Sequence, residues 1–450
     1  MPAFAWSGRL RNSRIIVQLA ILKVSVGWMY ALLSSNFNRI TIYELGIAAV
    51  LITTMLGVYH LASPFKVWFG KLSDERPLWG RHRTPYLLLG SMLSAIIFPA
   101  LPLLAFEMSS GMVWAFVLGY VLLLLYGIGL DMAGSAHYAL AAEVLPYNLR
   151  GIAVTAMFSM TIASTILSAA YIKFVMPVYT FETMQELYAL TPFVVGISAI
   201  LGLLGVEPRA PHAVRKQVAT NLPSNVFKMM QAMLRHDKAI EQFFFFVLLS
   251  TAGIFLQDSI LEVFGASVLA MSVKETTSFQ QIWGGGALLS MVVMGIATAI
   301  RPMNKVHIAL VGNYGTAIGL LLLVAVSLTE ERTFLYTALL LMGISTGLHT
   351  LGTVTTMMDL TVENAKATYM GLWGFAIMIG HGMASLLSGG LVTLLIEQIG
   401  IAASVGYAII FLFEAALLVM GAAMLFGINV QHFQQLHQRD LLLSLEAQAE

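Results

Sequence analysis

The chain has 450 residues, of which 58% are hydrophobic and only 10% are charged, and its net charge is +1. Soluble globular proteins carry roughly 25% charged residues, so this composition excludes an ordinary soluble enzyme, a disordered protein and a nucleic-acid-binding protein. Because one membrane-crossing helix needs about 20 apolar residues, twelve crossings would take about 240 residues. The composition therefore indicates an all-α polytopic membrane protein with short loops. The chain contains no cysteine, which excludes disulfides and thiolate chemistry.

The chain begins with three arginines in its first fourteen residues, and an apolar stretch over 15–35 follows at once. This stretch is too long for the core of a signal peptide, so it predicts a retained first span. Further apolar runs lie at 46–69, 85–107, 113–141, 152–176, 189–206, 239–262, 279–300, 307–328, 334–356, 368–396 and 403–427. In lipid only helices or closed barrels satisfy the backbone, and ten-residue alternation typical of barrel strands is not seen. The sequence predicts twelve transmembrane helices.

The loops between these runs differ in charge. Alternate loops and the two ends together carry eighteen Lys and Arg residues, whereas the opposite loops carry three. Basic residues accumulate on the cytoplasmic side of membrane proteins. We therefore expect both termini to be cytoplasmic, which agrees with an even number of spans.

The longest internal segment divides the chain into two similar halves. The predicted organisation is an N-terminal six-helix half (1–206), a central cytoplasmic loop with an interfacial helix (207–238), a C-terminal six-helix half (239–427) and a cytoplasmic tail (428–450). Glu143 and Arg150, after the fourth span, are matched 216 residues later by Asp359 and Lys366. Two parallel six-helix repeats joined by a cytoplasmic loop are the layout of the major facilitator fold.

The loop after the second span resembles the cytoplasmic signature of that fold, a glycine, an aspartate and then Gly-Arg-x-Arg. Arginines here can clamp acidic groups across a cytoplasmic gate, and the alternative is a basic loop that only sets topology. The expected gate residues are Gly70, Asp74, Gly80, Arg81, Arg83, Glu143, Arg150 and Asp359.

Two further motifs narrow the resemblance. The first is Asn38-Arg39 with Glu44, and the second is Gly371-Leu-Trp373-Gly374. With the loop after the second span, they resemble the PucC/LhaA family, also called bacteriochlorophyll-delivery proteins, over about residues 15–427.

This resemblance implies an assembly factor that binds or delivers chlorophyll-type pigment while light-harvesting or other chlorophyll-binding complexes form. The implied partners are membrane lipid, the pigment and nascent light-harvesting polypeptides, with no nucleic acid. The implied location is the inner membrane or a photosynthetic membrane, either intracytoplasmic or thylakoid. No tightly bound cofactor is required, and chlorophyll or bacteriochlorophyll is the expected ligand.

Ionisable residues inside spans are costly and often functional. Lys23 lies in the first span and Asp131 in the fourth, where they could form an ion pair. A neutral histidine can ligate the magnesium of a chlorophyll, although hydrogen bonding to a neighbouring helix is the more common role. The cavity or pigment candidates are Lys23, Asp131, His137, His349, His60 and His381. Glu414 in the twelfth span is expected to mark a lipid-exposed docking face for a partner helix or pigment, unless the span turns it inward.

Asp258 and Glu262 are one helical turn apart near the end of the seventh span. They could form a proton-coupling pair, but a solvated helix end is the preferred interpretation. No phosphate-binding glycine loop, zinc motif or other enzyme signature is present, so we expect neither an enzyme nor a metal site. The alternative to an assembly factor is a proton-coupled secondary transporter of a sugar or other small solute, because the loop after the second span is also similar to that of sugar carriers.

Overall fold

The structure, a computed structural model, describes residues 2–208, 234–235, 238–301, 303–360, 366–426 and 428. In this part of the chain all regular structure is helical, apart from one isolated bridge between Leu78 and Arg81. Eleven of the described helical segments are long and apolar enough to cross a membrane. The second predicted span corresponds to a shorter apolar helix over Ala49–His60, so twelve crossings remain a prediction.

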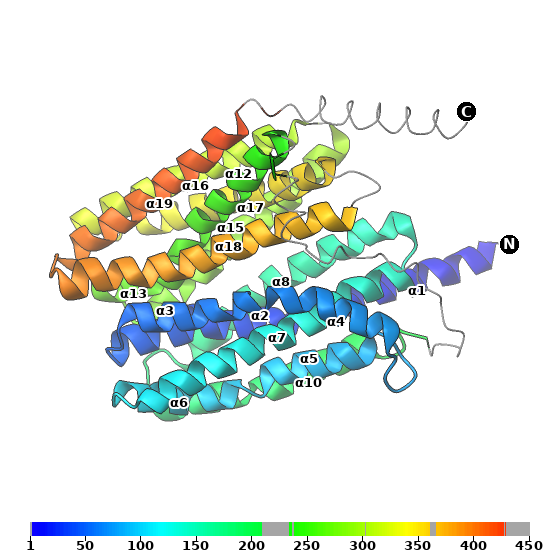
Figure 1. The fold of residues 1–450 in the computed structure, drawn as a ribbon, viewed down its shortest axis with the longest axis horizontal. Coiled ribbons are helices and arrows are strands. Elements are labelled where there is room, and N and C mark those ends of the chain that lie inside the picture. The colour runs from blue at the N-terminus through cyan, green and yellow to red at the C-terminus, as the bar shows by residue number, and fades with distance from the viewer. Residues whose placement is uncertain are drawn as a thin grey trace. The chain divides into compact units, whose positions relative to one another are not determined.

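Most helices, drawn in Figure 1, match the predicted spans to within a few residues at their ends. Their bounds up to the central segment are α1 Pro2–Ile21, α2 Lys23–Ala31, η1 Leu32–Phe37, η2 Ile40–Glu44, α3 Ala49–Gly57, η3 Val58–Ala62, α4 Ser63–Glu75, α5 Thr84–Ala95, η4 Phe98–Ala100, α6 Leu101–Ser109, α7 Val113–Val144, α8 Tyr147–Val175, α9 Phe181–Ala189 and α10 Thr191–Leu203. After it they are α12 Lys238–Leu256, η5 Gln257–Ser259, α13 Leu261–Ser267, α14 Val273–Thr276, α15 Ser278–Ile300, α16 Lys305–Thr329, α17 Leu335–Asp359, α18 Lys366–Val392, η7 Thr393–Gln398 and α19 Ala403–Leu425.

The chain forms two compact units. Unit 1 comprises Met1–Val214, Asp258–Gly285 and Ser385–Gly406, and unit 2 comprises Arg215–Gln257, Gly286–Ala384 and Tyr407–Glu450. Unit 1 therefore takes in one end of each of four spans from the second half of the sequence. The division into halves at 1–206 and 239–427 stays a prediction, and the expected interfacial helix around Ser224 and the tail lie outside the described residues.

Small residues allow helices to pack closely inside each unit. In unit 1, a Cβ added at Gly90 of α5 would lie 2.6 Å from the carbonyl oxygen of Gly129 in α7. In unit 2, a Cβ at Gly312 of α16 would overlap the backbone of His349 in α17. Small residues have this role at helix interfaces in membranes, where the backbones themselves come into contact.

Candidate functional site

The first span loses regular α-helical geometry where its polar residues begin. Two π-helical segments, η1 and η2, follow α2, and nearly all of their residues up to Thr41 are buried. Ser35, Asn36, Asn38 and Arg39 are among the buried polar residues of this segment. π-Helical turns are rare and occur frequently at functional sites, because the wider turn changes the direction of side chains. This segment is therefore the starting point of the candidate site.

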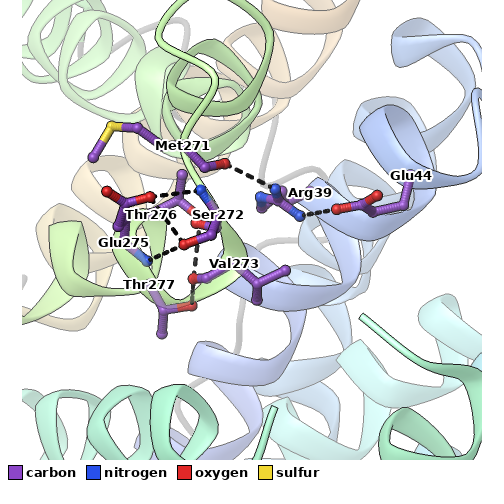
Figure 2. Close-up of polar contacts among 8 residues, drawn as sticks. All are labelled: Arg39, Glu44, Met271, Ser272, Val273, Glu275, Thr276 and Thr277. Atoms are coloured by element: carbon purple, nitrogen blue, oxygen red, sulfur yellow. Dashed lines mark hydrogen bonds and ion pairs between the residues drawn. The ribbon is translucent and has the colours of Figure 1, made fainter. Parts of the chain in front are cut away.

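Arg39 connects the end of the first span to the segment before α14. Its Nη1 donates to Oε1 of Glu44 at 2.7 Å, and its Nη2 donates to the carbonyl oxygen of Met271 at 3.2 Å (Figure 2). Ser272 and Glu275 form a capping box that fixes the start of α14 directly after Met271. Arg39 is only 2% exposed, so these acceptors supply the hydrogen bonds that water would otherwise provide.

The seventh span is interrupted opposite the same segment. Asn38 donates from Nδ2 to the carbonyl oxygen of Ser259, which lies in the short η5 turn between α12 and α13. An interrupted helix leaves backbone carbonyls without helical partners, and Asn38 satisfies one of them. Asn38, Arg39 and Glu44, the residues of the first motif, thus lie in one polar cluster within unit 1.

Two carboxyl groups complete this cluster. Asp258 accepts a hydrogen bond of 2.7 Å from the hydroxyl of Tyr30 and a longer one of 3.5 Å from Nε2 of Gln280. Glu262 is 1% exposed, and neither of its carboxyl oxygens has a hydrogen-bond partner among the described residues. The Ser35 hydroxyl and the charges of Asp258 and Arg39 are close enough to act on Glu262. The preferred expectation of a solvated helix end is therefore wrong for Glu262, whereas Asp258 is half-buried and takes its hydrogen bonds from other helices.

Several buried oxygen acceptors of the cluster have no hydrogen-bond donor among the described residues. Besides Glu262, Oδ1 of Asn38 and Oε1 of Gln280 have no partner in the described part of the chain. Buried acceptors without donors are costly, and ionisable residues on an interrupted membrane helix commonly bind ions, protons or substrates. The arrangement can therefore take up a proton, a cation or a donor group.

A second polar network surrounds the loop after the second span. Arg83 donates to Oε1 of Glu143 from Nε at 3.1 Å and from Nη2 at 2.6 Å, and it also bonds the Ser73 hydroxyl. Glu207 accepts from the backbone amides of His82, Arg83 and Thr84 at 2.8, 2.9 and 2.6 Å. A carboxylate at this position accepts hydrogen bonds from the free amides at the start of α5. Its negative charge also interacts favourably with the positive end of the α5 helix dipole.

The remaining gate residues have different outcomes. Trp79 and Gly80 both have left-handed backbone angles, with φ of 51° and 71°, and form a two-residue turn between Leu78 and Arg81. In unit 2, Nζ of Lys305 lies 2.8 Å from both carboxylate oxygens of Asp359. Gly70 lies in α4 with open space around it. The side chains of Asp74 and Arg150 lie outside the described part of the structure, so a gate that includes them stays a prediction.

The histidines lie in aromatic and apolar surroundings. His137 and His349 are 3% and 6% exposed, and each hydrogen-bonds a neighbouring helix backbone, at Leu19 and Ala309. One ring nitrogen of each has no partner among the described residues, but that nitrogen is buried. His60 and His381 are half-buried and make tilted ring contacts with Tyr59 and Phe255, with ring centroids 4.0 and 4.1 Å apart. Of these four histidines, only His60 and His381 are partly exposed.

Lys23 and Asp131 do not form the expected ion pair in the described structure. The ammonium group of Lys23 lies 5.0 Å from the ring centroid of Tyr138, and the positive charge of Lys66 acts on both Lys23 and Asp131. These four residues all belong to unit 1.

The expectation that Glu414 marks a lipid-exposed docking face is wrong. Glu414 is 0% exposed, and its carboxyl oxygens have no partner among the described residues. A Cβ at Gly253 of α12 would lie 3.2 Å from the Glu414 carbonyl oxygen, so α19 turns this residue toward α12 within unit 2. The inward-facing alternative is therefore the correct one. Trp373 is also buried, with its ring edge-on to Phe243 at 4.9 Å, whereas Gly374 has open space around it and Gly371 lies in α18.

Solved structures with a similar fold are membrane transporters. A bacterial homologue of the human lysosomal transporter Spinster has a TM-score of 0.68 at 12% identity and covers 94% of this chain and 98% of its own. The D-xylose-proton symporter has a TM-score of 0.64 at 16% identity, covering 90% of this chain and 96% of its own. At such low identity these similarities establish the major facilitator fold alone.

Sequence relatives give the family. An uncharacterised protein of the puhA-bchM intergenic region of Rhodobacter capsulatus is 25% identical over 92% of this chain and 88% of its own length. A bacteriochlorophyll synthase 44.5 kDa chain of the same species is 24% identical over 92% and 95%, and the PucC protein of Rhodovulum sulfidophilum is 26% identical over 86% of both. The family model described as PUCC protein matches residues 36–433. The chain therefore belongs to the PUCC family and is a photosynthesis-related integral membrane protein with a major facilitator fold.

Proposed function

We propose that this protein is a membrane assembly factor that binds or delivers chlorophyll-type pigment during assembly of light-harvesting or other chlorophyll-binding complexes. The observation that carries the proposal is the PUCC match over residues 36–433. This match includes every residue of the polar cluster apart from Tyr30 and Ser35, which precede it. The name of one relative, a bacteriochlorophyll synthase chain, supports a connection with pigment. The proposed partners are the pigment, nascent antenna polypeptides and membrane lipid.

The proposal needs a surface that a large ring can reach. The buried nitrogens of His137 and His349 do not offer one. Lys23, His60 and Tyr138 of unit 1 are half-buried rather than buried. We therefore place pigment contact on this half-buried surface rather than in the packed helix core. Because one relative has a synthase name, the expectation that the chain is no enzyme stays a prediction.

The direct test is gentle solubilisation of the protein from its native membrane, followed by an absorption spectrum and identification of the polypeptides that co-purify. We expect chlorophyll-type absorption bands and small antenna polypeptides in the same fraction. A folded protein that co-purifies with neither would contradict the proposal. An Arg39→Ala variant, which removes the connection to Glu44 and Met271, should retain less of both.

Proton-coupled transport of a small solute is the second candidate function. It is favoured by Glu262, a buried carboxyl group without a partner among the described residues, next to Asp258 in the interrupted seventh span. Reconstitution into liposomes that contain a pH-sensitive dye would distinguish the two. Solute-dependent proton uptake that is lost in Glu262→Gln would support transport, whereas pigment binding without proton uptake would support the assembly factor.

A further inference from the structure

Two lysines of unit 1, the half-buried Lys23 and the exposed Lys66, lie near one aromatic ring. The ammonium groups of Lys23 in α2 and Lys66 in α4 lie 5.0 and 6.0 Å from the ring centroid of Tyr138 in α7. Asp131 lies two helical turns before Tyr138 on α7, and its carboxyl group interacts electrostatically with Lys66. We refer to Lys23, Lys66, Asp131 and Tyr138 as the lysine patch.

The lysine patch holds two ammonium groups and only one carboxyl group, so its positive charge is not fully balanced. Lys66 acts on Lys23 as a like charge, and neither ammonium group lies within ion-pair distance of a carboxylate in the described part of the chain. Lys23 lies within the apolar run over 15–35, where a charged ammonium group is costly, so an anionic ligand would lower this cost.

An aromatic wall adjoins the lysine patch. Tyr59 and His60 lie in η3 with ring centroids 4.0 Å apart, and Tyr126 packs edge-on against Tyr59 at 5.4 Å. A Cβ added at Gly127, which lies on α7 one helical turn before the aspartate of the lysine patch, would overlap the Tyr59 carbonyl oxygen, so the wall packs on α7 beside the patch. Tyr59, His60 and Tyr138 are all half-buried. Flat aromatic side chains suit the stacking of a planar apolar ring.

We propose that the lysine patch binds the free carboxylate of a tetrapyrrole acid, a pigment form whose propionate side chain is not esterified. Lys23 and Lys66 are the counter-ions of the carboxylate, Asp131 limits the site to one negative charge, and the aromatic wall contacts the macrocycle. This inference rests on the proposed function and deepens it, because it names the chemical form of the pigment. An esterified pigment lacks the charge that the two lysines recognise.

The test uses the full chain in nanodiscs of zwitterionic lipid, titrated with a chlorophyllide-type free acid and with its methyl ester, and followed by pigment fluorescence polarisation. Because hydrogen bonds between charged groups are stronger than neutral ones, we expect the acid to bind at least about tenfold more tightly than the ester. Lys23→Gln and Lys66→Gln should each reduce this preference without weakening the ester. Lys23→Arg should keep it, and so should Lys274→Gln, which changes an exposed lysine of unit 1 away from the patch.

The alternative outcomes separate the two proposals. Equal binding of acid and ester, or a preference unchanged in both glutamine variants, would overturn this inference and leave pigment binding standing. Binding of neither pigment would overturn the inference together with the proposed function. A preference that disappears when anionic phospholipid replaces the zwitterionic lipid would assign the lysine patch to lipid phosphate and so overturn it.

Discussion

Lys305 donates from Nζ to both carboxylate oxygens of Asp359, each at 2.8 Å. Arg83 and Glu143 form the corresponding pair in unit 1, with a shortest distance of 2.6 Å. Asp359 follows Glu143 by 216 residues and Lys305 follows Arg83 by 222 residues, so the internal repeat seen in the sequence carries the same ionic contact into both units. Since each contact joins the start of one helix to the end of another, it stabilises the bundle end within its own unit.

The two pairs should differ in energy. The Arg83 side chain is 8% exposed and also donates a hydrogen bond to the Ser73 hydroxyl, whereas the Lys305 side chain is 43% exposed. A double-mutant cycle with Arg83→Ala and Glu143→Ala should give a coupling free energy of about 1 to 2 kcal/mol. The matching cycle for Lys305 and Asp359 should give less than about 1 kcal/mol, because solvent screens an exposed pair. Thermal unfolding in one detergent measures both, and equal coupling would contradict the assignment.

The sequence allowed much of this fold to be predicted, because hydropathy reports directly on lipid exposure. The predicted runs match the helices to within a few residues at most ends, and the repeat indicated that Glu143 and Asp359 have equivalent positions. The role of Glu207 was missed, since capping of α5 depends on the meeting of two segments more than 120 residues apart. A carboxylate just before Pro208, at the end of an apolar run, was the available signal.

The candidate site was predicted only in part. The motif residues Asn38, Arg39 and Glu44 were identified, but their connection to Ser259 and Met271 requires the tertiary fold. The polar neighbours of Asp258 suggested solvent, whereas Tyr30 and Gln280 supply its hydrogen bonds from other helices. Polarity in the sequence does not show whether the partner of a carboxyl group is water or a second helix.

Tyr30 should be essential to the polar cluster. Tyr30→Phe removes the 2.7 Å bond to Asp258 and leaves that carboxyl group with the 3.5 Å contact to Gln280. We expect a loss of about 1 to 3 kcal/mol in unfolding free energy, the usual cost of depriving a buried charged acceptor of its partner, and reduced complex assembly. Tyr43→Phe is the matched control, since Tyr43 is 43% exposed. Unfolding temperature and complementation measure the two effects, and a Tyr30→Phe variant that equals the control in both would contradict this role.

The predicted topology can be tested by cysteine labelling, because the chain has no cysteine of its own. Ser110→Cys lies in the exposed turn between α6 and α7, and Thr220→Cys lies in the central segment. A membrane-impermeant maleimide added to intact cells should label position 110 and should reach position 220 only after permeabilisation. The reverse pattern would invert the orientation and with it the cytoplasmic placement of both termini.

Glu262 and Glu414 offer a matched comparison between function and packing. Both side chains are almost fully buried, and neither has a hydrogen-bond partner among the described residues. Replacement of a buried, poorly paired charge by an apolar residue of similar size is often neutral or stabilising. Glu262→Leu and Glu414→Leu should therefore both keep or raise the unfolding temperature.

The two variants should differ in activity. Glu262 lies beside Asp258, Ser35 and Arg39 in the interrupted seventh span, whereas α19 turns Glu414 toward the packed helix α12. Residues that lower stability but are retained are typical of functional sites. We therefore expect Glu262→Leu to abolish complementation. Glu262→Gln keeps a polar group and should retain part of it. Glu414→Leu should assemble complexes normally. Each substitution removes one polar group, the carboxyl group itself. Loss of assembly in Glu414→Leu together with full assembly in Glu262→Leu would therefore contradict a functional site in unit 1 and indicate one in unit 2.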